Sequence, residues 1–180
     1  MSTLSQFMPG GKPRQVTVYT SGSGTYTPVA PNSWCYVTMI GGGGSGGGGY
    51  TCYGTFYGGY GTAGRRLEQW TKVVSTASYA VGAGGYWNNF ATYYGDNWQQ
   101  VAAGASTFNG LSAAGGSNGG GVRVDGQITS AIYGLGYYTH GGSYGVAGWG
   151  TTVGNSNGCT SWSNGGNGNG GIIVVQDFGP

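Results

Sequence analysis

The stretch WCYVTMI at Trp34–Ile40 runs directly into the tract GGGGSGGGG at Gly41–Gly49, and this junction decides the fold. Successive side chains of a strand point to opposite faces, and both faces of Trp34–Ile40 would be largely apolar. The stretch therefore predicts a central strand that is covered on both sides. The tract that follows carries no side chain except that of Ser45, so it must adopt a different kind of structure.

Glycine makes up 44 of the 180 residues, and further tracts lie at Gly115–Gly121 and Gly165–Gly171. Disorder is the first alternative, because glycine is costly to order. Disordered chains combine high charge with few aromatic residues, whereas this chain has 6 basic and 4 acidic residues against 15 Tyr, 6 Trp and 5 Phe. A collagen-like fibre needs glycine at every third position and abundant proline, which the irregular spacing and 5 prolines exclude.

The glycine tracts allow neighbouring backbones to approach closely. Extended left-handed helices with three residues per turn form no internal hydrogen bonds, so several lying side by side can pair their N–H and C=O groups with each other. The alternative is that the tracts are plain surface loops. Structureless loops beyond about 12–15 residues are uncommon in compact domains, which favours ordered glycine helices.

Short apolar or alternating runs elsewhere predict further strands. These strands and short extended pieces lie at Arg14–Thr20, Thr25–Val29, Arg65–Val74, Ser75–Val81, Val122–Val124, Gln127–Tyr133 and Ile172–Gln176. The last of these is continuously apolar, which predicts a buried strand, and no stretch has the period of a helix. The predicted fold class is mainly β: sandwich-like strands combined with packed polyglycine-II helices and long glycine and aromatic loops, with essentially no α-helix. Residues 1–13 are interpreted as an N-terminal arm or attachment peptide and residues 14–180 as one domain.

Charge and hydropathy exclude two classes of partner. The formal net charge is +2, and 6 basic residues are too few for the many phosphate contacts of a nucleic-acid-binding protein. No apolar run approaches the ~18 residues of a membrane-spanning helix, and the N-terminal residues lack the apolar region of a signal peptide. We therefore expect synthesis in a cytoplasm, no insertion into a membrane and no binding of nucleic acid.

The residues that usually carry catalysis or bind metal are few and scattered. The acidic residues are Glu68, Asp96, Asp125 and Asp177, no two of which are close in sequence, and His140 is the only histidine. General acid–base catalysis needs positioned titratable groups, and a zinc site generally needs four grouped ligands. The sequence predicts no enzyme, no metal site and no cofactor.

The three cysteines cannot all pair within one chain, because their number is odd. Cys35 lies in the apolar strand and is predicted to be a buried thiol. A bridge between Cys52 and Cys159 is one arrangement, and two free thiols are the other.

Aromatic residues interleaved with Gly, Asn and Gln form the candidate binding surface. Tyr, Ser, Gly and Asn also dominate antibody binding loops, where rigid rings contact sugars or protein epitopes. The alternative for each ring is a place in the core that glycine cannot supply. The candidate contact residues are Trp87, Asn88, Asn89, Tyr93, Tyr94, Asp96 and Trp98, followed by Tyr137, Tyr138, His140 and Tyr144.

Four motifs, taken in order, resemble one family. They are VTMI followed by GGGGSGGGG at 37–49, VGAGG at 81–85, STFNGLSAAGG at 106–116 and GGNGNGGIIVVQDF at 165–178. This order is similar to that of the glycine-rich domain of bacteriophage tail proteins, over residues 22–178. Ser106–Gly110 reads STFNG, where the family has a tighter S-x-F-G element.

The family includes the receptor-binding adhesins at tail-fibre tips, in which packed polyglycine-II helices carry aromatic loops at the distal end. The resemblance implies a virion protein that binds a bacterial surface receptor: a glycan, a pilus or an outer-membrane protein. It also implies contact with other phage tail proteins, as a homotrimer or at the tip of a trimeric fibre. The alternative is a purely structural tail or baseplate protein that mediates virion assembly.

Overall fold

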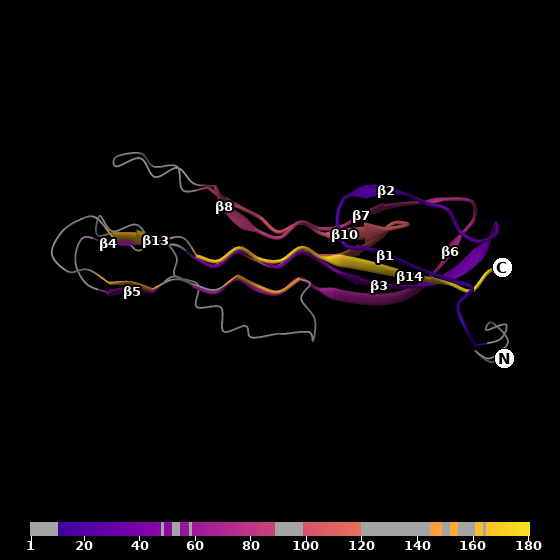
Figure 1. Ribbon diagram of the computed structural model, residues 1–180, viewed down its shortest axis with the longest axis horizontal. Helices are drawn as coiled ribbons and strands as arrows, with labels where there is room; N and C mark the ends of the chain where they lie inside the picture. The colour runs from indigo at the N-terminus through magenta and orange to yellow at the C-terminus, as the bar shows by residue number, and fades with distance from the viewer. Residues whose placement is uncertain are drawn as a thin grey trace.

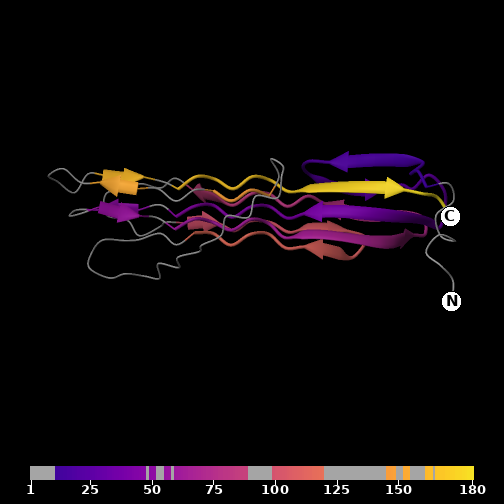
Figure 2. The same cartoon turned by 90° about the horizontal axis from the view of Figure 1, so that it is seen from below.

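The computed structural model describes residues 11–47, 49–51, 55–57, 59–88, 99–119, 145–148, 152–154, 161–163 and 165–180. These residues are mainly β, with no helix among them. The molecule is elongated, with its two main sheets and both chain termini at one end and several short strands at the other (Figure 1). Glycine-rich segments run side by side between the two ends, as Figure 2 shows from a second direction.

The first sheet is antiparallel and has the strand order β1-β14-β3-β6. Its strands are β1 (Gln15–Tyr19), β14 (Ile172–Asp177), β3 (Ser33–Ile40) and β6 (Arg66–Val73). The strand predicted from the opening stretch is central, because β3 lies between β14 and β6. The first and last strands of the chain are neighbours, so β14 closes the domain against β1.

The second sheet is also antiparallel and has the order β11-β10-β7-β2. Its strands are β2 (Ser23–Tyr26), β7 (Ala77–Ala80), β10 (Ser106–Phe108) and β11 (Leu111–Ala113). No strand was predicted over Ser106–Ala114, where β10 and β11 form a hairpin. Asn109 and Gly110 turn the chain with φ of 47° and 80°, the left-handed conformation that Asn and Gly adopt most readily in tight hairpin turns.

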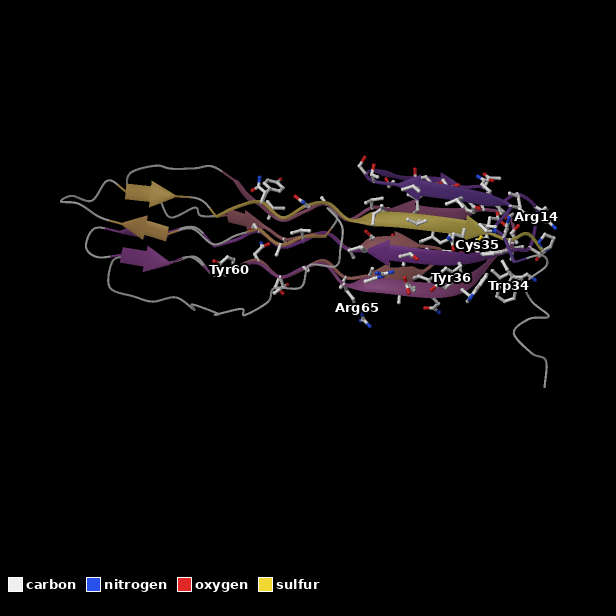
Figure 3. The ribbon with its side chains drawn as sticks, turned by 60° about the horizontal axis from the view of Figure 1, so that its bottom comes forward. Arg14, Trp34, Cys35, Tyr36, Tyr60 and Arg65 are labelled. Carbon is white, nitrogen blue, oxygen red and sulfur yellow. The ribbon has the colours of Figure 1, made fainter. Side chains whose placement is uncertain are left out.

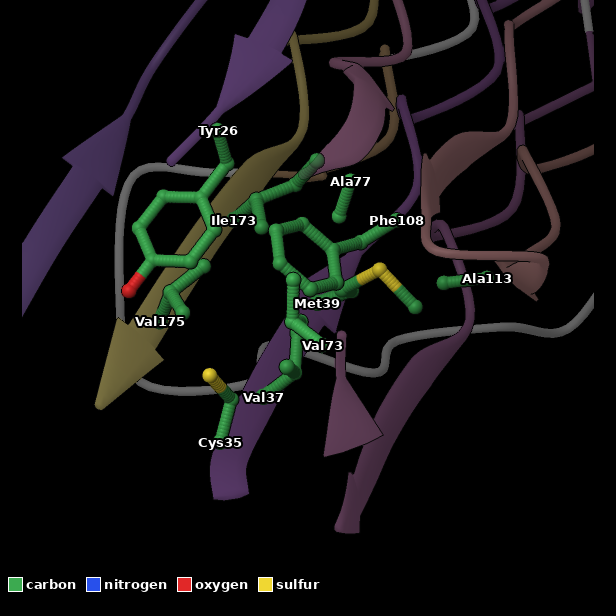
Figure 4. Packing of buried hydrophobic residues seen from close by; sticks show 10 residues of the cluster. All are labelled: Tyr26, Cys35, Val37, Met39, Val73, Ala77, Phe108, Ala113, Ile173 and Val175. Carbon is green, nitrogen blue, oxygen red and sulfur yellow. The ribbon is translucent and has the colours of Figure 1, made fainter. Parts of the chain in front are cut away.

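Buried side chains from both sheets form one hydrophobic cluster, shown in Figure 4. The first sheet contributes Cys35, Val37, Met39, Val73, Ile173 and Val175, and the second sheet contributes Tyr26, Ala77, Phe108 and Ala113. Cys35 is fully buried, which confirms the prediction made from its strand. The core therefore lies at the end of the molecule that holds the termini.

The prediction that β3 is covered on both faces is wrong. Its odd-numbered residues are buried, but Tyr36, Thr38 and Ile40 are only half-buried and Trp34 is 36% exposed. The second sheet covers only one face of the first. The same alternation runs along β14, so the continuous apolar run there is buried at every second residue.

Six short strands lie outside the two main sheets, on the side away from the termini. They are β4 (Gly49–Thr51), β5 (Thr55–Tyr57), β8 (Tyr86–Asn88), β9 (Gln99–Val101), β12 (Thr152–Gly154) and β13 (Ser161–Ser163). They form three antiparallel pairs: β4 with β13, β5 with β12, and β8 with β9. The extended pieces predicted at 122–124 and 127–133, and residues 1–10 of the predicted arm, lie outside the described residues.

Candidate functional site

The segment 41–47, which continues β3, is the axis of the glycine-rich part. Its N–H groups donate to neighbouring segments with a repeat of three residues. Gly41, Gly44 and Gly47 donate to carbonyls of the segment 59–65, at N···O distances of 3.0, 2.9 and 2.6 Å. A three-residue repeat is what an extended helix with three residues per turn produces when it lies against straight neighbours.

Six segments surround 41–47, and each exchanges at least one backbone hydrogen bond with it. They are 59–65, 81–85, 102–105, 114–119, 145–148 and 165–171. Further backbone bonds join neighbours within this ring, for example Gly61 N–H to Gly148 O at 3.1 Å and Gly168 N–H to Gly85 O at 2.9 Å. We call these seven segments the glycine bundle. It pairs the backbone groups of long non-strand segments with one another, which satisfies polar groups that would otherwise be buried alone.

The bundle requires glycine because its segments are too close for a side chain. A Cβ built on Gly44 would lie 1.9 Å from Ser117 O, and one built on Gly42 would lie 2.0 Å from Ala83 O. Among the described residues of the bundle, only Gly145 has a positive φ. The requirement is therefore steric, and the close approach of Cα to carbonyl oxygen is the geometry of weak Cα–H···O contacts.

One side chain interrupts the axis. Ser45 is fully buried, and its Oγ has no hydrogen-bond partner among the described residues. Its backbone N–H donates to Asn118 Oδ1 at 3.0 Å, while Asn118 Nδ2 donates to Val101 O at 3.1 Å. The Asn118 side chain thus makes hydrogen bonds of the kind that backbone groups make elsewhere in the bundle. It does so beside Val101, the last residue of β9.

The β8–β9 pair lies away from the main sheets, beside the glycine bundle, and β8 is nearer the middle of the molecule than β4, β5 and β13 are (Figure 1). Trp87 and Asn88 lie in β8, where they pair with Gln100 and Gln99 of β9. The sequence shows no alternation typical of a strand in this region, because β8 and β9 are only three residues long each. These two are the candidate contact residues whose backbone the structure describes.

The other candidate contact residues lie outside the described residues. Asn89, Tyr93, Tyr94, Asp96 and Trp98 fall in the stretch that links β8 to β9, and Tyr137, Tyr138, His140 and Tyr144 fall in the stretch 120–144. Gly119 donates to Ser45 O, whereas Gly145 lies beside Ile40. Of the two described residues that flank 120–144, Gly119 therefore lies along the axis of the glycine bundle and Gly145 lies beside the sheets.

Described aromatic residues lie on the surface as well as in the core. Figure 3 shows Trp34 near the termini and Tyr60 on the glycine bundle, and Tyr60 is 50% exposed. Tyr36, Trp70 and Phe178 form a row of tilted rings with centroids 5.2 and 5.0 Å apart. The described aromatic residues thus include both buried and exposed rings, and the binding role of the candidate residues stays a prediction.

The end that holds the termini has a polar cluster around Asp177, which the sequence analysis missed. The fully buried Asp177 carboxylate accepts hydrogen bonds from Tyr26 OH at 2.7 Å, Val29 N–H at 2.9 Å and Gly179 N–H at 2.8 Å. Burial alone would raise the pKa of Asp177, but these hydrogen bonds outweigh it and hold the pKa below its ordinary value. Burial, and then the nearby Asp177 charge, raise the pKa of the Cys35 thiol to about 11.

This cluster is structural rather than catalytic in its geometry. It ties the C-terminus to the turn before β3, and its carboxylate is closed off from solvent. A signal for it did exist in the sequence: an acidic residue in an otherwise apolar terminal strand must find donors when it is buried.

Within the described ranges, no group of three or more His, Cys, Asp or Glu residues could hold a metal ion, and no helix is long and apolar enough to cross a membrane. No protein-family model matches the chain, and no curated protein matches it. The function is therefore argued from the geometry and from the sequence motifs.

Proposed function

We propose that this protein is a bacteriophage tail-tip or tail-fibre component that binds the bacterial host surface through aromatic-rich loops. One observation carries the proposal: the glycine bundle separates the end with the termini from the end with the short strands. A chain attached through its terminal end would carry β8 and β9, the strands that flank five candidate contact residues, away from the point of attachment.

We also propose that the segments of the glycine bundle are polyglycine-II helices next to a β-sandwich. The support is the three-residue repeat of the donors Gly41, Gly44 and Gly47, the ring of six neighbours and the absence of room for Cβ atoms. In a polyglycine-II lattice each helix has this repeat because three residues complete one turn.

A rigid platform favours the binding role. Ordering loops on binding costs affinity, and a support fixed by many backbone hydrogen bonds reduces that cost. The whole chain has only 6 basic and 4 acidic residues and a net charge of +2, so nonspecific electrostatic attraction to other molecules should be weak. Tyr, Trp and Asn side chains on such a platform suit sugar rings or a protein epitope.

The receptor would be a glycan, a pilus or an outer-membrane protein, and the protein would act in the virion without a cofactor and without catalysis. The test is binding of fluorescently labelled protein to a panel of bacterial strains that includes a glycan-stripped and a pilus-free strain. We expect saturable binding to one group of strains, with loss in whichever stripped strain lacks the receptor. Failure of correctly folded protein to bind any strain would contradict the proposal.

A second candidate is a purely structural tail or baseplate protein. It is favoured by the surface near the termini, where β1 is an edge strand without charged residues and exposes Val16 and Val18 at 53% each. An uncharged, exposed edge strand is a surface for pairing with another chain. Substitution of both valines by lysine would then block virion assembly, whereas the adhesin proposal predicts that changes at β8 abolish cell binding and leave assembly intact.

A further inference from the structure

The two edges of the first sheet differ in charge. The edge strand β6 exposes Arg66, Glu68 and Lys72, whereas the edge strand β1 has no charged residue in Gln15–Tyr19. Charged side chains on an edge strand hinder its pairing with another chain, and an uncharged edge lacks this protection. Of these two edges, β1 is therefore the one that is open to pairing.

The free side of β1 has unpaired backbone groups at Val16 and Val18. Phe178, which continues β14, donates its N–H to β3 at 2.9 Å, and the direction of the backbone groups alternates along an antiparallel strand. The groups of Val175 therefore point to β1, and those of its partner Thr17 point back to β14. The N–H and C=O groups of Val16 and Val18 have the opposite direction and point away from the sheet.

The side chains of the same two valines are exposed. They lie on the face of the first sheet that the second sheet leaves open, because they pair with Gln176 and Val174, which are only half-buried. Within the described part of the chain, β1 pairs with β14 alone, and in Figure 2 it forms the indigo edge beside the yellow β14. Exposed apolar side chains next to unpaired backbone groups are the features to which an additional strand binds.

The sequence of β1 is complementary to itself. When two copies of β1 lie antiparallel with Thr17 opposite Thr17 of the second copy, each Val16 lies opposite Val18 of the other copy. The outward N–H of each valine then faces the outward C=O of the other, as in a hydrogen-bonded antiparallel pair. Opposed threonines and β-branched side chains both stabilise a sheet, and one two-fold axis generates both valine contacts.

The charge nearest to β1 does not oppose this arrangement. Arg14 precedes β1, and its side chain lies against Gly179, where an added Cβ would be 3.0 Å from Arg14 Cζ. In the register centred on Thr17, Arg14 lies opposite Thr20 of the second copy, which is uncharged. No like charges therefore face each other across the paired strands.

We propose that the free protein forms a two-fold dimer in which β1 pairs antiparallel with β1 of a second copy, in the register centred on Thr17. The two first sheets then join into one sheet with the order β6-β3-β14-β1-β1-β14-β3-β6. The strands lie along the long axis of the molecule (Figure 2), so the two copies point in opposite directions.

The dimer is independent of receptor binding, because it follows from β1 alone. It also excludes the pairing of β1 with a tail protein, since both would use the same backbone groups. Assembly through β1 would therefore require the dimer to dissociate.

Sedimentation equilibrium of the full chain, over a range of protein concentrations, tests the proposal. We expect a reversible equilibrium between monomer and dimer. The variant Val16→Lys, Val18→Lys puts an ammonium group opposite an ammonium group at both contacts, and it should raise the dimer dissociation constant about tenfold or more. Both positions are exposed, so the thermal midpoint, measured at a concentration where both proteins are monomeric, should stay that of the wild type.

The variant Val16→Lys, Val18→Glu is the matched test of the register. In the register centred on Thr17 it puts opposite charges at both contacts, so it should dimerise more tightly than the double-lysine variant, and added salt should weaken the dimer. A wild type that stays monomeric or forms a trimer, or a double-lysine variant that dimerises as tightly as the wild type, would overturn the proposal. Equal dissociation constants for the two charged variants would overturn the register. These measurements use no bacterial cells, so a failure of receptor binding leaves their result unchanged.

Discussion

Gly168 and Gly170 differ in the room that each has for a side chain, although they lie two residues apart in one segment of the glycine bundle. A Cβ on Gly168 would lie 1.9 Å from Gly43 O, whereas a Cβ on Gly170 would have its nearest neighbour, Gly82 O, at 3.7 Å. Neither residue has a positive φ. Alanine is therefore excluded at Gly168 by packing alone and is compatible with the backbone at Gly170.

The cost of Gly168→Ala follows from the distance that must be gained. Ordinary contact begins near 3.4 Å, so the segment 165–171 must retreat from 41–47 by about 1.5 Å. That retreat would break the bonds from Gly43 N–H to Asn169 O and from Gly46 N–H to Gly166 O, both now 2.8 Å. Gly43 and Gly46 are buried, and each of their two N–H groups left without a partner costs about 1–3 kcal/mol, so we expect a loss of about 2–6 kcal/mol.

Gly170→Ala is the matched control. It restricts the unfolded chain without a clash, and such changes stabilise proteins by about 0.4–1 kcal/mol. Urea denaturation of both variants, followed by intrinsic aromatic fluorescence, gives the two free energies of unfolding. If Gly168→Ala is destabilised by less than about 0.5 kcal/mol relative to Gly170→Ala, the steric account of the bundle is wrong.

Two substitutions at buried polar groups should change the free energy of unfolding in opposite directions. Ser45→Ala removes a hydroxyl that is buried without a hydrogen-bond partner in the described part of the chain. It should raise the free energy of unfolding, measured by urea denaturation, by about 1 kcal/mol. A lower free energy of unfolding would show that the hydroxyl does form a hydrogen bond. Asp177→Asn replaces one carboxylate oxygen by an amide donor that faces either the donors of Tyr26 and Val29 or the N–H of Gly179. It should cost about 3 kcal/mol in the same assay. Because the pKa of Asp177 is lowered by folding, its contribution is present above its unfolded pKa and lost as the pH falls through the folded value. The stability of the wild type should therefore decline below about pH 4, with a shallower decline in Asp177→Asn; equal slopes would contradict this role.

The strands of the main sheets could be predicted because their sequences alternate or are continuously apolar. Ser33–Ile40, Arg66–Val73 and Ile172–Asp177 agree with prediction to within one residue at each end. The prediction of a two-sided cover for β3 failed because apolar residues such as Tyr36 and Trp70 pack against each other, with tilted rings, at a half-buried surface. Composition alone does not distinguish such a surface from a core.

The sequence predicted that the glycine tracts are structurally ordered, because long structureless loops are uncommon in compact domains. It did not predict which tracts lie next to each other. Which segment donates to which depends on contacts between residues as distant in sequence as Gly43 and Asn169, and glycine carries no side chain that could encode such a partner. The short strands β8 and β9 were also missed, since three residues are too few to show a period. Their position follows from the bundle that supports them.

The candidate contact residues were chosen because aromatic rings lay among amides in a stretch without a period. The structure places Trp87 and Asn88 in β8, outside the main sheets and beside the glycine bundle. The other candidate residues lie outside the described residues and stay predictions.

The central claim of the proposal is that the side of the molecule with β8 binds the bacterial host and that the end with the termini does not. A pair of tryptophan variants tests it most directly: Trp87→Ala at the β8 end, and Trp34→Ala at the terminal end, where Trp34 is 36% exposed. Saturation binding to a receptive bacterial strain should be lost or weakened at least tenfold, equivalent to about 1.4 kcal/mol, in folded Trp87→Ala and unchanged in Trp34→Ala. Unchanged binding by Trp87→Ala together with loss in Trp34→Ala would contradict the account and place the binding surface at the opposite end.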